Sequence, residues 1–284
     1  MTKFKVSTRK DLPQIADKLK LDKEQIIDMQ AISAVLPFRV NDYVVENLID
    51  SSDIPDDPIF QLTFPQRGML HDEDYQHMRD LVVSGASDTD VNLAANKIRN
   101  KLNPHPAGQM ELNVPKLDGE AVAGMQHKYQ ETILFFPSQG QTCHAYCTYC
   151  FRWAQFIGDR DLKFASREAS ELVRYVRENP QVSSVLITGG DPMVMRTSVL
   201  RRYIEPLLAE DLPNLHSIRI GTKALAYWPH RFVEGEDADD FMRLIGEVKA
   251  AGKHLALMAH SSHSRELEPD IAQLAVKRLL DAGA

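Results

Sequence analysis

Residues 184–192 read SVLITGGDP, a short apolar run that ends in two glycines, an aspartate and a proline. Such a run is typical of a buried strand, and the residues after it indicate a turn. Three further apolar runs occur at residues 132–137, 217–221 and 254–259, and amphipathic stretches of helical spacing at residues 166–178, 196–209, 237–251 and 269–282. This alternation predicts right-handed strand–helix–strand units and a parallel sheet covered by helices.

The chain before residue 127 has a different character. Apolar residues at helical spacing predict helices over residues 23–36, 72–84 and 88–102. Residues 50–65 carry three prolines among acidic residues and predict a loop, while residues 115–125 predict an extended arm. We therefore expect an N-terminal helical and irregular domain of residues 1–126. A core of residues 127–284 would follow, with about four strand–helix units, too few to close an ordinary eight-stranded barrel.

Composition narrows the class of protein. The 284 residues include 33 Lys and Arg against 40 Asp and Glu, a net charge of −7, and 43% are hydrophobic. These values are typical of a globular protein and argue against a broad nucleic-acid-binding surface, which needs a basic face. No apolar run approaches the roughly 20 residues that span a bilayer, and the first residues lack the pattern of a secretory signal. We expect a cytoplasmic protein that does not enter a membrane.

All three cysteines lie in GQTCHAYCTYCFRW, residues 140–153, directly after the first predicted strand. Cys143, Cys147 and Cys150 are spaced C-x3-C-x2-C, and three thiolates this close suit zinc or an iron–sulfur cluster. Zinc would need a fourth ligand, for which the sequence offers His144, His260 or His263. A four-iron cluster held by three cysteines would instead leave one iron open to a small molecule.

At these residues the sequence resembles the radical S-adenosylmethionine (SAM) superfamily, whose pattern is C-x3-C-x-aromatic-C, with Tyr149 as the aromatic residue. The resemblance implies that the thiolates hold a [4Fe-4S] cluster whose open iron binds SAM. Reductive cleavage of SAM then yields a radical that abstracts hydrogen from the substrate. Gly189, Gly190 and Asp191 resemble the superfamily element that binds the SAM amino group. Arg219 and Thr222, in and after the third predicted strand, are further candidates for contact with SAM.

From about residue 26 onward the sequence resembles the lysine 2,3-aminomutase family, on stretches that include HKYQETILFF, TGGDP and RIGTKALAYWPHRF. The resemblance implies a partial (β/α)6 TIM-like barrel of the radical SAM type, with a helical N-terminal region. It also implies migration of an amino group between adjacent carbons with pyridoxal phosphate (PLP) as a second cofactor. Arg152 matches the arginine that binds the substrate carboxylate, and Lys128 and Tyr129 match a pair near PLP. Thr132 stands where the family has a second arginine.

The family's Schiff-base lysine lies beyond residue 284, and Lys223, Lys253 and Lys277 do not match its motif. We therefore expect a C-terminally truncated chain with an exposed sheet edge after the fourth strand. The leading hypothesis is a radical SAM isomerase that acts on a small amino acid, lysine by default, and needs an electron donor. The alternatives are a radical SAM enzyme without PLP that acts on another amino acid or peptide, and a zinc-binding module without catalysis. The sequence is compatible with a homo-oligomer and identifies no catalytic residue.

Overall fold

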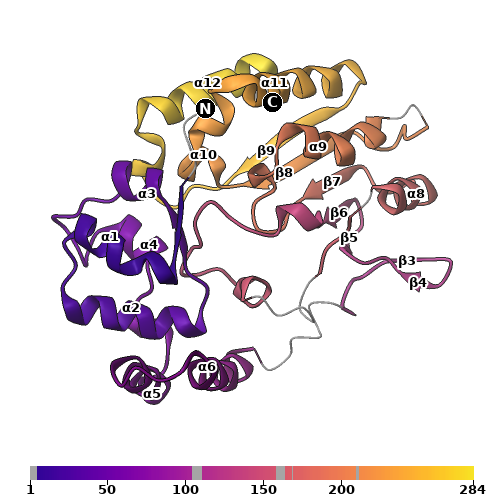
Figure 1. The fold of residues 1–284 in the computed structure, drawn as a ribbon. Helices are drawn as coiled ribbons and strands as arrows, with labels where there is room; N and C mark the ends of the chain where they lie inside the picture. Colours follow the sequence, from indigo (N-terminus) through magenta and orange to yellow (C-terminus); the bar gives the residue numbers. More distant parts are fainter. Residues whose placement is uncertain (1–4, 104–110, 158–163, 168, 209–210) are drawn as a thin grey trace. The chain divides into compact units, whose positions relative to one another are not determined.

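The computed structural model describes residues 5–103, 111–157, 164–167, 169–208 and 211–284. Contacts divide the chain into two compact units (Figure 1). Unit 1 takes its described residues from Ala107–Cys143 and Lys163–Ala284, and unit 2 from Phe4–Pro106 and His144–Leu162. These units are defined by contacts and each combines separate segments, whereas the boundary expected between residues 126 and 127 divides the chain in sequence order. That boundary stays a prediction.

Unit 1 contains a five-stranded sheet in the order β5-β6-β7-β8-β9. Its strands are β5 (Met125–Tyr129), β6 (Thr132–Phe135), β7 (Ser184–Ile187), β8 (Ser217–Thr222) and β9 (His254–Ala259). Strands β6 to β9 are parallel, and β5 pairs antiparallel with β6. The prediction of a mixed α/β fold with four parallel strands is therefore confirmed. Strand β9 forms one edge of this sheet, as expected.

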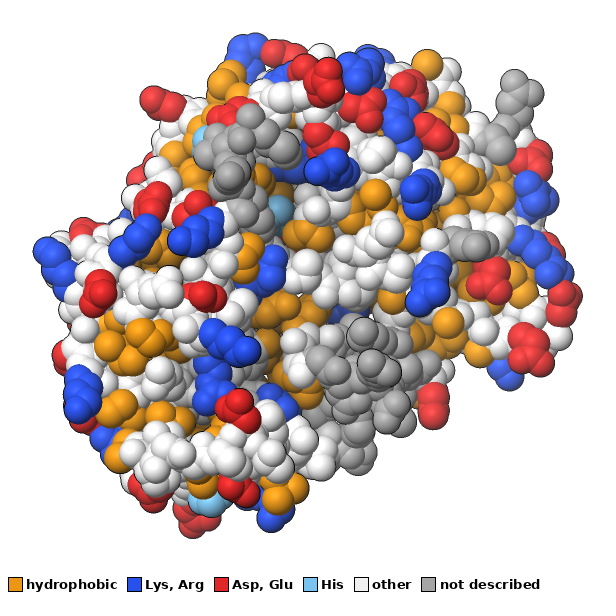
Figure 2. Space-filling view, in the orientation of Figure 1, with side chains coloured by type: hydrophobic (Ala, Val, Ile, Leu, Met, Phe, Trp, Pro, Cys, Tyr) orange, Lys and Arg blue, Asp and Glu red, His pale blue; other side chains and the backbone are white. Residues whose placement is uncertain are grey.

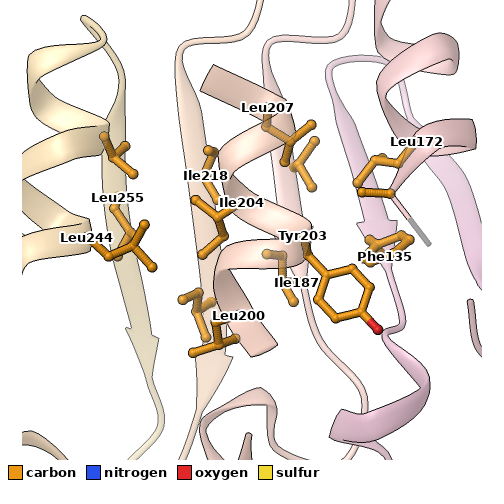
Figure 3. Packing of buried hydrophobic residues seen from close by; sticks show 14 of the residues in the cluster. Phe135, Leu172, Ile187, Leu200, Tyr203, Ile204, Leu207, Ile218, Leu244 and Leu255 are labelled. Atoms are coloured by element: carbon orange, nitrogen blue, oxygen red, sulfur yellow. The ribbon is translucent and has the colours of Figure 1, made fainter. Parts of the chain in front are cut away.

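Helices cover one face of this sheet. They are α8 (Ser170–Glu178), α9 (Thr197–Ile204), α11 (Gly235–Ala250) and α12 (Asp270–Ala282). Figure 3 shows Leu200 and Ile204 of α9 pointing toward Ile187 and Ile218 of the sheet, and all four are fully buried. Burying one such side chain stabilises the fold by about 1.5–3 kcal/mol. The alternating apolar residues of the strands thus specify both the sheet and the face on which the helices lie.

The opposite face of the sheet is less buried. Its side chains come from the alternate positions of each strand, so that Leu134, Leu186, Arg219 and Ala256 lie in one register row and are half-buried. A two-stranded hairpin, β3 (Lys116–Leu117) with β4 (Glu120–Ala121), lies in the segment predicted to be extended.

Unit 2 is mainly helical. It contains α1 (Leu12–Leu19), α2 (Lys23–Val35), α3 (Asp42–Asn47), α4 (Pro58–Thr63), α5 (Asp72–Val83) and α6 (Asp88–Leu102). The strands β1 (Val6–Thr8) and β2 (Arg39–Asn41) form a short antiparallel pair. Helices α2, α5 and α6 share a buried cluster that includes Ile32, Met78 and Ala95. The three helices predicted from apolar spacing are therefore confirmed, with bounds within one residue of the expected ones.

The prediction of a loop over residues 50–65 is wrong in its second half, where α4 forms. Pro58 occupies the first position of this helix, where its missing N–H group costs nothing. Asp57 caps the helix, since its Oδ1 accepts a hydrogen bond from the Phe60 N–H (2.7 Å). Ile59 and Phe60 are fully buried. A proline among acidic residues therefore begins a helix here instead of preventing one.

Shorter helices connect the main elements. They are α10 (Ala224–Tyr227) and the 3-10 helices η1 (Arg9–Asp11), η2 (Arg67–Met69), η3 (Ser138–Gly140), η4 (Trp153–Phe156), η5 (Pro192–Val194), η6 (Glu205–Leu208), η7 (Pro229–Phe232) and η8 (Ser264–Leu267). In the described part of the chain, no helix combines the length and the apolar character needed to cross a membrane. Acidic and basic side chains are interspersed over the surface of α11 and α12 (Figure 2).

Candidate functional site

The Gly-Gly-Asp turn follows the carboxyl end of β7 and is hydrogen-bonded to the segment that leads into the first cysteine. The Gly190 N–H donates to the Gly140 carbonyl (3.0 Å), and the Asp191 N–H donates to the Thr142 carbonyl (2.6 Å). Carboxyl ends of parallel strands are where ligands normally bind in α/β proteins. The structure thus brings two motifs that lie more than 40 residues apart in the sequence into direct backbone contact.

Glycine is required at position 190 because the two backbone segments approach closely. A Cβ atom built on Gly190 would lie 2.3 Å from the Thr142 carbonyl oxygen and 2.6 Å from the Thr142 nitrogen. Gly189 adopts a φ of +155°, and a Cβ atom there would lie 2.5 Å from Nε2 of Gln141. Any side chain would therefore force the turn away from the segment before Cys143.

The Asp191 side chain fastens this turn to the end of β8. Only 3% of the residue is exposed. Its Oδ1 accepts hydrogen bonds from the Met193 N–H (2.9 Å) and the Thr222 hydroxyl (2.7 Å). Its Oδ2 accepts from the Lys223 N–H (2.8 Å), and the Thr222 hydroxyl accepts in turn from the Ala224 N–H (2.9 Å). The structure therefore gives Asp191 and Thr222 a joint positioning role, and direct contact with SAM stays a prediction for both.

Arg231 holds the residues that follow the same turn, and the sequence analysis did not single it out. The residue lies in η7 and is 6% exposed. Its guanidinium donates to the carbonyls of Met193 and Met195 (both 3.2 Å). Nη1 forms an ion pair with Asp237 (2.9 Å), although burial still lowers the pKa of Arg231 overall. The only signal in the sequence was the position of Arg231 within the stretch WPHRF.

The cysteine segment continues from unit 1 into unit 2. Cys143 ends a segment of unit 1, and Cys147 and Cys150 lie in unit 2. Within unit 2, the Cys150 N–H donates to the Cys147 carbonyl (3.0 Å), so these two cysteines share a tight turn. Burial raises the pKa of the Cys150 thiol, and the nearby Cys147 adds to the increase. Metal binding would have to displace this proton, as it does for cysteine ligands in general.

A cavity of about 340 Å³ within unit 2 is lined by this turn. Its walls include Cys147, Tyr149 and Cys150 together with apolar and aromatic side chains of the helical region, among them Phe64 and Trp153. Tyr149, the aromatic residue of the cysteine motif, is 57% exposed. Cys147 and Cys150 therefore line a largely apolar cavity. Such surroundings keep water away from a bound inorganic group and influence its redox potential.

Among the described residues, no three His, Cys, Asp or Glu side chains are gathered so as to hold a metal ion. The joint binding of a cluster by Cys143, Cys147 and Cys150 therefore stays a prediction from their spacing. The same holds for the histidines considered for zinc. His144 is buried, His260 is exposed at the end of β9, and Nδ1 of His263 accepts a hydrogen bond from the Arg265 N–H (3.2 Å).

The remaining candidates lie at separate places. Arg152 donates a hydrogen bond to Oε1 of Gln155. Lys128 and Tyr129 are exposed on the edge strand β5, with the Lys128 Nζ 5.8 Å from the centre of the Tyr129 ring. Arg219 lies within β8, as the predicted strand over residues 217–221 implies, and its Nη2 donates to the Thr132 hydroxyl (2.9 Å). Neither Lys128 nor Arg219 is therefore part of the turn formed by the Gly-Gly-Asp element.

Comparison with known proteins finds related aminomutases. The chain is 34% identical over 162 residues to a putative L-lysine 2,3-aminomutase of Aquifex aeolicus, covering 57% of this chain and 41% of that protein. It is 31% identical over 113 residues to the L-lysine 2,3-aminomutase of Bacillus subtilis, covering 40% of this chain and 23% of the relative. It is 23% identical over 282 residues to the glutamate 2,3-aminomutase of Clostridioides difficile, covering 99% and 55%.

No protein-family model matches the sequence. The chain spans about half or less of the length of these curated relatives. Several aminomutases are therefore among the proteins that this chain is similar to. These relatives support the resemblance of the chain to the lysine 2,3-aminomutase family of radical SAM enzymes.

Proposed function

We propose that this chain carries the cluster-binding and SAM-binding part of a radical SAM isomerase that moves an amino group between adjacent carbons of an amino acid. The observation that supports it most is the backbone contact between Gly190 and Asp191 and the segment before Cys143. That contact lies next to the start of the cysteine motif. We further propose that the sheet from β6 to β9 is part of a (β/α)6 barrel.

The proposed ligands of a [4Fe-4S] cluster are Cys143, Cys147 and Cys150. The donor set fits, since three thiolates satisfy three irons and leave the fourth for SAM. The cluster would supply the electron that cleaves SAM reductively. The protein's own contribution would be positional: Asp191 and Thr222 hold the end of β8 against the turn, and Arg231 fixes the residues that follow it.

PLP is part of the proposal only through the resemblance. Lys128 and Tyr129 are exposed on an edge strand and do not enclose a phosphate group in the described part of the chain. We therefore assign no step of the reaction to PLP. A radical SAM enzyme that works without PLP remains the second candidate, and addition of PLP to the purified chain distinguishes the two. A new visible absorption band is expected for the aminomutase and none for the alternative.

Anaerobic reconstitution with iron and sulfide, followed by reductant, SAM and either L-lysine or L-glutamate, tests the proposed activity. The two amino acids are chosen because the relatives are named for them. We expect formation of 5′-deoxyadenosine and of a β-amino acid from one of the two substrates. A Cys147→Ser variant should form neither product. Purified protein that contains zinc but no iron or acid-labile sulfide would contradict the proposal and favour the binding module.

5′-Deoxyadenosine without any β-amino acid would support SAM cleavage and refute the amino migration. The Thr197→Val variant is a useful control for folding, because Thr197 accepts a hydrogen bond from Arg231 (3.0 Å) but lies outside the turn itself. It should keep more activity than Cys147→Ser. This comparison separates loss of the cluster from a mild loss of stability.

A further inference from the structure

A buried ion pair joins the segments that follow β8 and β9, two strands that are neighbours in the sheet of unit 1 (Figure 1). Lys223 is the first residue after β8, and Glu266 lies in η8, shortly after β9 ends. The Lys223 Nζ lies 2.7 Å from Oε1 of Glu266, whose side chain is fully buried. The same Nζ lies 4.6 Å from the centre of the Tyr227 ring, so the ammonium is held from two sides.

The carboxylate of Glu266 also holds the loop after β9. Its Oε2 accepts hydrogen bonds from the Ser261 hydroxyl (2.8 Å) and from the Ser262 N–H (2.7 Å). At the start of this loop, the His260 N–H donates to the Thr222 carbonyl (2.9 Å), which keeps the loop beside the end of β8. One carboxylate therefore accepts from both segments at the carboxyl edge of the sheet, where ligands normally bind in α/β proteins.

Lys223 connects this loop to the Gly-Gly-Asp turn. Its backbone N–H donates to Oδ2 of Asp191, and its ammonium donates to Glu266. The Asp191 N–H in turn donates to the Thr142 carbonyl. A continuous series of hydrogen bonds therefore runs from the segment before Cys143 through the turn to the loop after β9, and all of it lies within unit 1.

A buried ion pair is a costly way to hold two segments together. Both charges lose their hydration, and well-packed apolar side chains of similar volume often stabilise a protein as much or more. Charged hydrogen bonds are short and directional, however, and Glu266 uses both of its oxygens. Such an arrangement suits the positioning of a loop better than the stabilisation of the fold.

We propose that Glu266 is a positioning residue for the site at the carboxyl edge of the sheet. Through Lys223, it braces the Gly-Gly-Asp turn against the loop after β9 and preserves the geometry in which the turn binds SAM. This role rests on the proposed function, in which that turn contacts SAM. Glu266 is itself fully buried, so loss of its charge acts by loosening the turn and the loop.

Hydrogen–deuterium exchange of the full chain, without cluster or SAM, measures this coupling directly. In Glu266→Gln we expect several-fold faster exchange at the amides of Ser262, Lys223 and Asp191, because each of them donates within the braced network. Glu268→Gln is the matched control. It makes the same change close by in the sequence, at an exposed residue, and should exchange as the parent does.

SAM binding to the reconstituted chain tests the functional part. The affinity is measured by titrating SAM against the electron paramagnetic resonance spectrum of the reduced cluster. We expect Glu266→Gln to assemble the cluster as the parent does and to bind SAM about tenfold more weakly, as is typical when a supporting residue behind a bound group is lost. Glu268→Gln should bind SAM like the parent.

Lys223→Met combined with Glu266→Gln provides a second test should Glu266→Gln fail to fold. This double variant leaves no unpaired buried charge and keeps the side chains close to their original size. We expect it to give the circular dichroism spectrum of the parent and still to bind SAM about tenfold more weakly. A merely structural role predicts instead that SAM affinity returns together with stability.

The outcomes separate this proposal from the proposed function. Unchanged exchange at Asp191 and Lys223 in Glu266→Gln, or equal SAM affinity of the parent and both variants, would overturn the positioning role. A parent cluster that does not respond to SAM would refute the proposed function, and the exchange measurement would still decide whether Glu266 braces the turn.

Discussion

Replacing Gly190 with alanine should disrupt the contact between the Gly-Gly-Asp turn and the cysteine segment. The new Cβ atom would lie 2.3 Å from the Thr142 carbonyl oxygen, more than 1 Å closer than the roughly 3.5 Å of an ordinary contact. The nearest atoms belong to the backbone, so no side chain can rotate away. Either the turn or residues 140–142 must move.

The cost can be worked out from the contacts that this movement breaks. The hydrogen bonds from Gly190 to Gly140 and from Asp191 to Thr142 are worth about 1 kcal/mol each. Overpacking of a tight site typically adds about 1–3 kcal/mol. We therefore expect Gly190→Ala to lower the free energy of unfolding by about 3–5 kcal/mol. Urea denaturation followed by circular dichroism measures this difference.

Gly221→Ala is the matched control for this experiment. Gly221 lies in the neighbouring strand β8, and a Cβ atom there would have its nearest contact at 3.6 Å, with the Thr188 hydroxyl. This distance is an ordinary van der Waals contact, so we expect a change of less than about 1 kcal/mol. Equal stabilities of Gly190→Ala and Gly221→Ala would refute the argument that close backbone approach requires glycine at position 190.

Three further predictions concern charged side chains of unit 1. Asp191→Asn should lower the free energy of unfolding by about 2–4 kcal/mol, because the amide NH₂ group of asparagine would face a hydrogen-bond donor. A change below about 0.5 kcal/mol on urea denaturation, which is the effect of a neutral surface substitution, would contradict this prediction. Arg231→Lys should lower the free energy of unfolding by about 3–5 kcal/mol, since an ammonium group cannot reach both carbonyls and Asp237. The variant should also bind SAM more weakly in equilibrium dialysis. A variant as stable as the parent would argue against the positioning role of Arg231. Hydrogen bonds from Arg201 lower the pKa values of Asp240 and Glu247. These carboxylates therefore stabilise the fold above their usual pKa values of 3.8 and 4.5, and this stabilisation is lost as the pH falls through that range and below. Arg201→Met should therefore lower the free energy of unfolding by about 1 kcal/mol at pH 7, because the ion pairs of Arg201 with Asp240 and Glu247 are partly exposed, and by less at pH 3. A loss of stability that is the same at both pH values in urea titrations would contradict this prediction.

Local sequence patterns predicted most of the fold of unit 1. The apolar runs of β6 to β9 identified parallel strands, because a strand covered by helices must place apolar residues against them. The same reasoning failed for β5, whose residues Gln126, His127 and Lys128 are polar. This edge strand pairs with β6 through its backbone, and its side chains carry little information about that pairing.

The candidate site was predictable only in its local parts. Spacing identified the cysteines, and the glycines stood out at the end of a strand. The roles of Arg231 and Arg219 depend on contacts between segments that are distant in the sequence. Arg219 was a candidate for contact with SAM, and its side chain donates a hydrogen bond to Thr132 at the start of β6. Strand alternation shows on which face a residue lies, but not toward which end of the strand a long side chain extends.

The central claim is that Cys143, Cys147 and Cys150 hold a [4Fe-4S] cluster with one iron open to SAM. Electron paramagnetic resonance of the reconstituted, reduced chain, recorded with and without SAM, tests this claim most directly. We predict the spectrum of a reduced [4Fe-4S] cluster that changes when SAM is added, and no such spectrum from Cys150→Ser. A cluster spectrum that SAM leaves unaltered, or the lack of any cluster after reconstitution, would contradict the account.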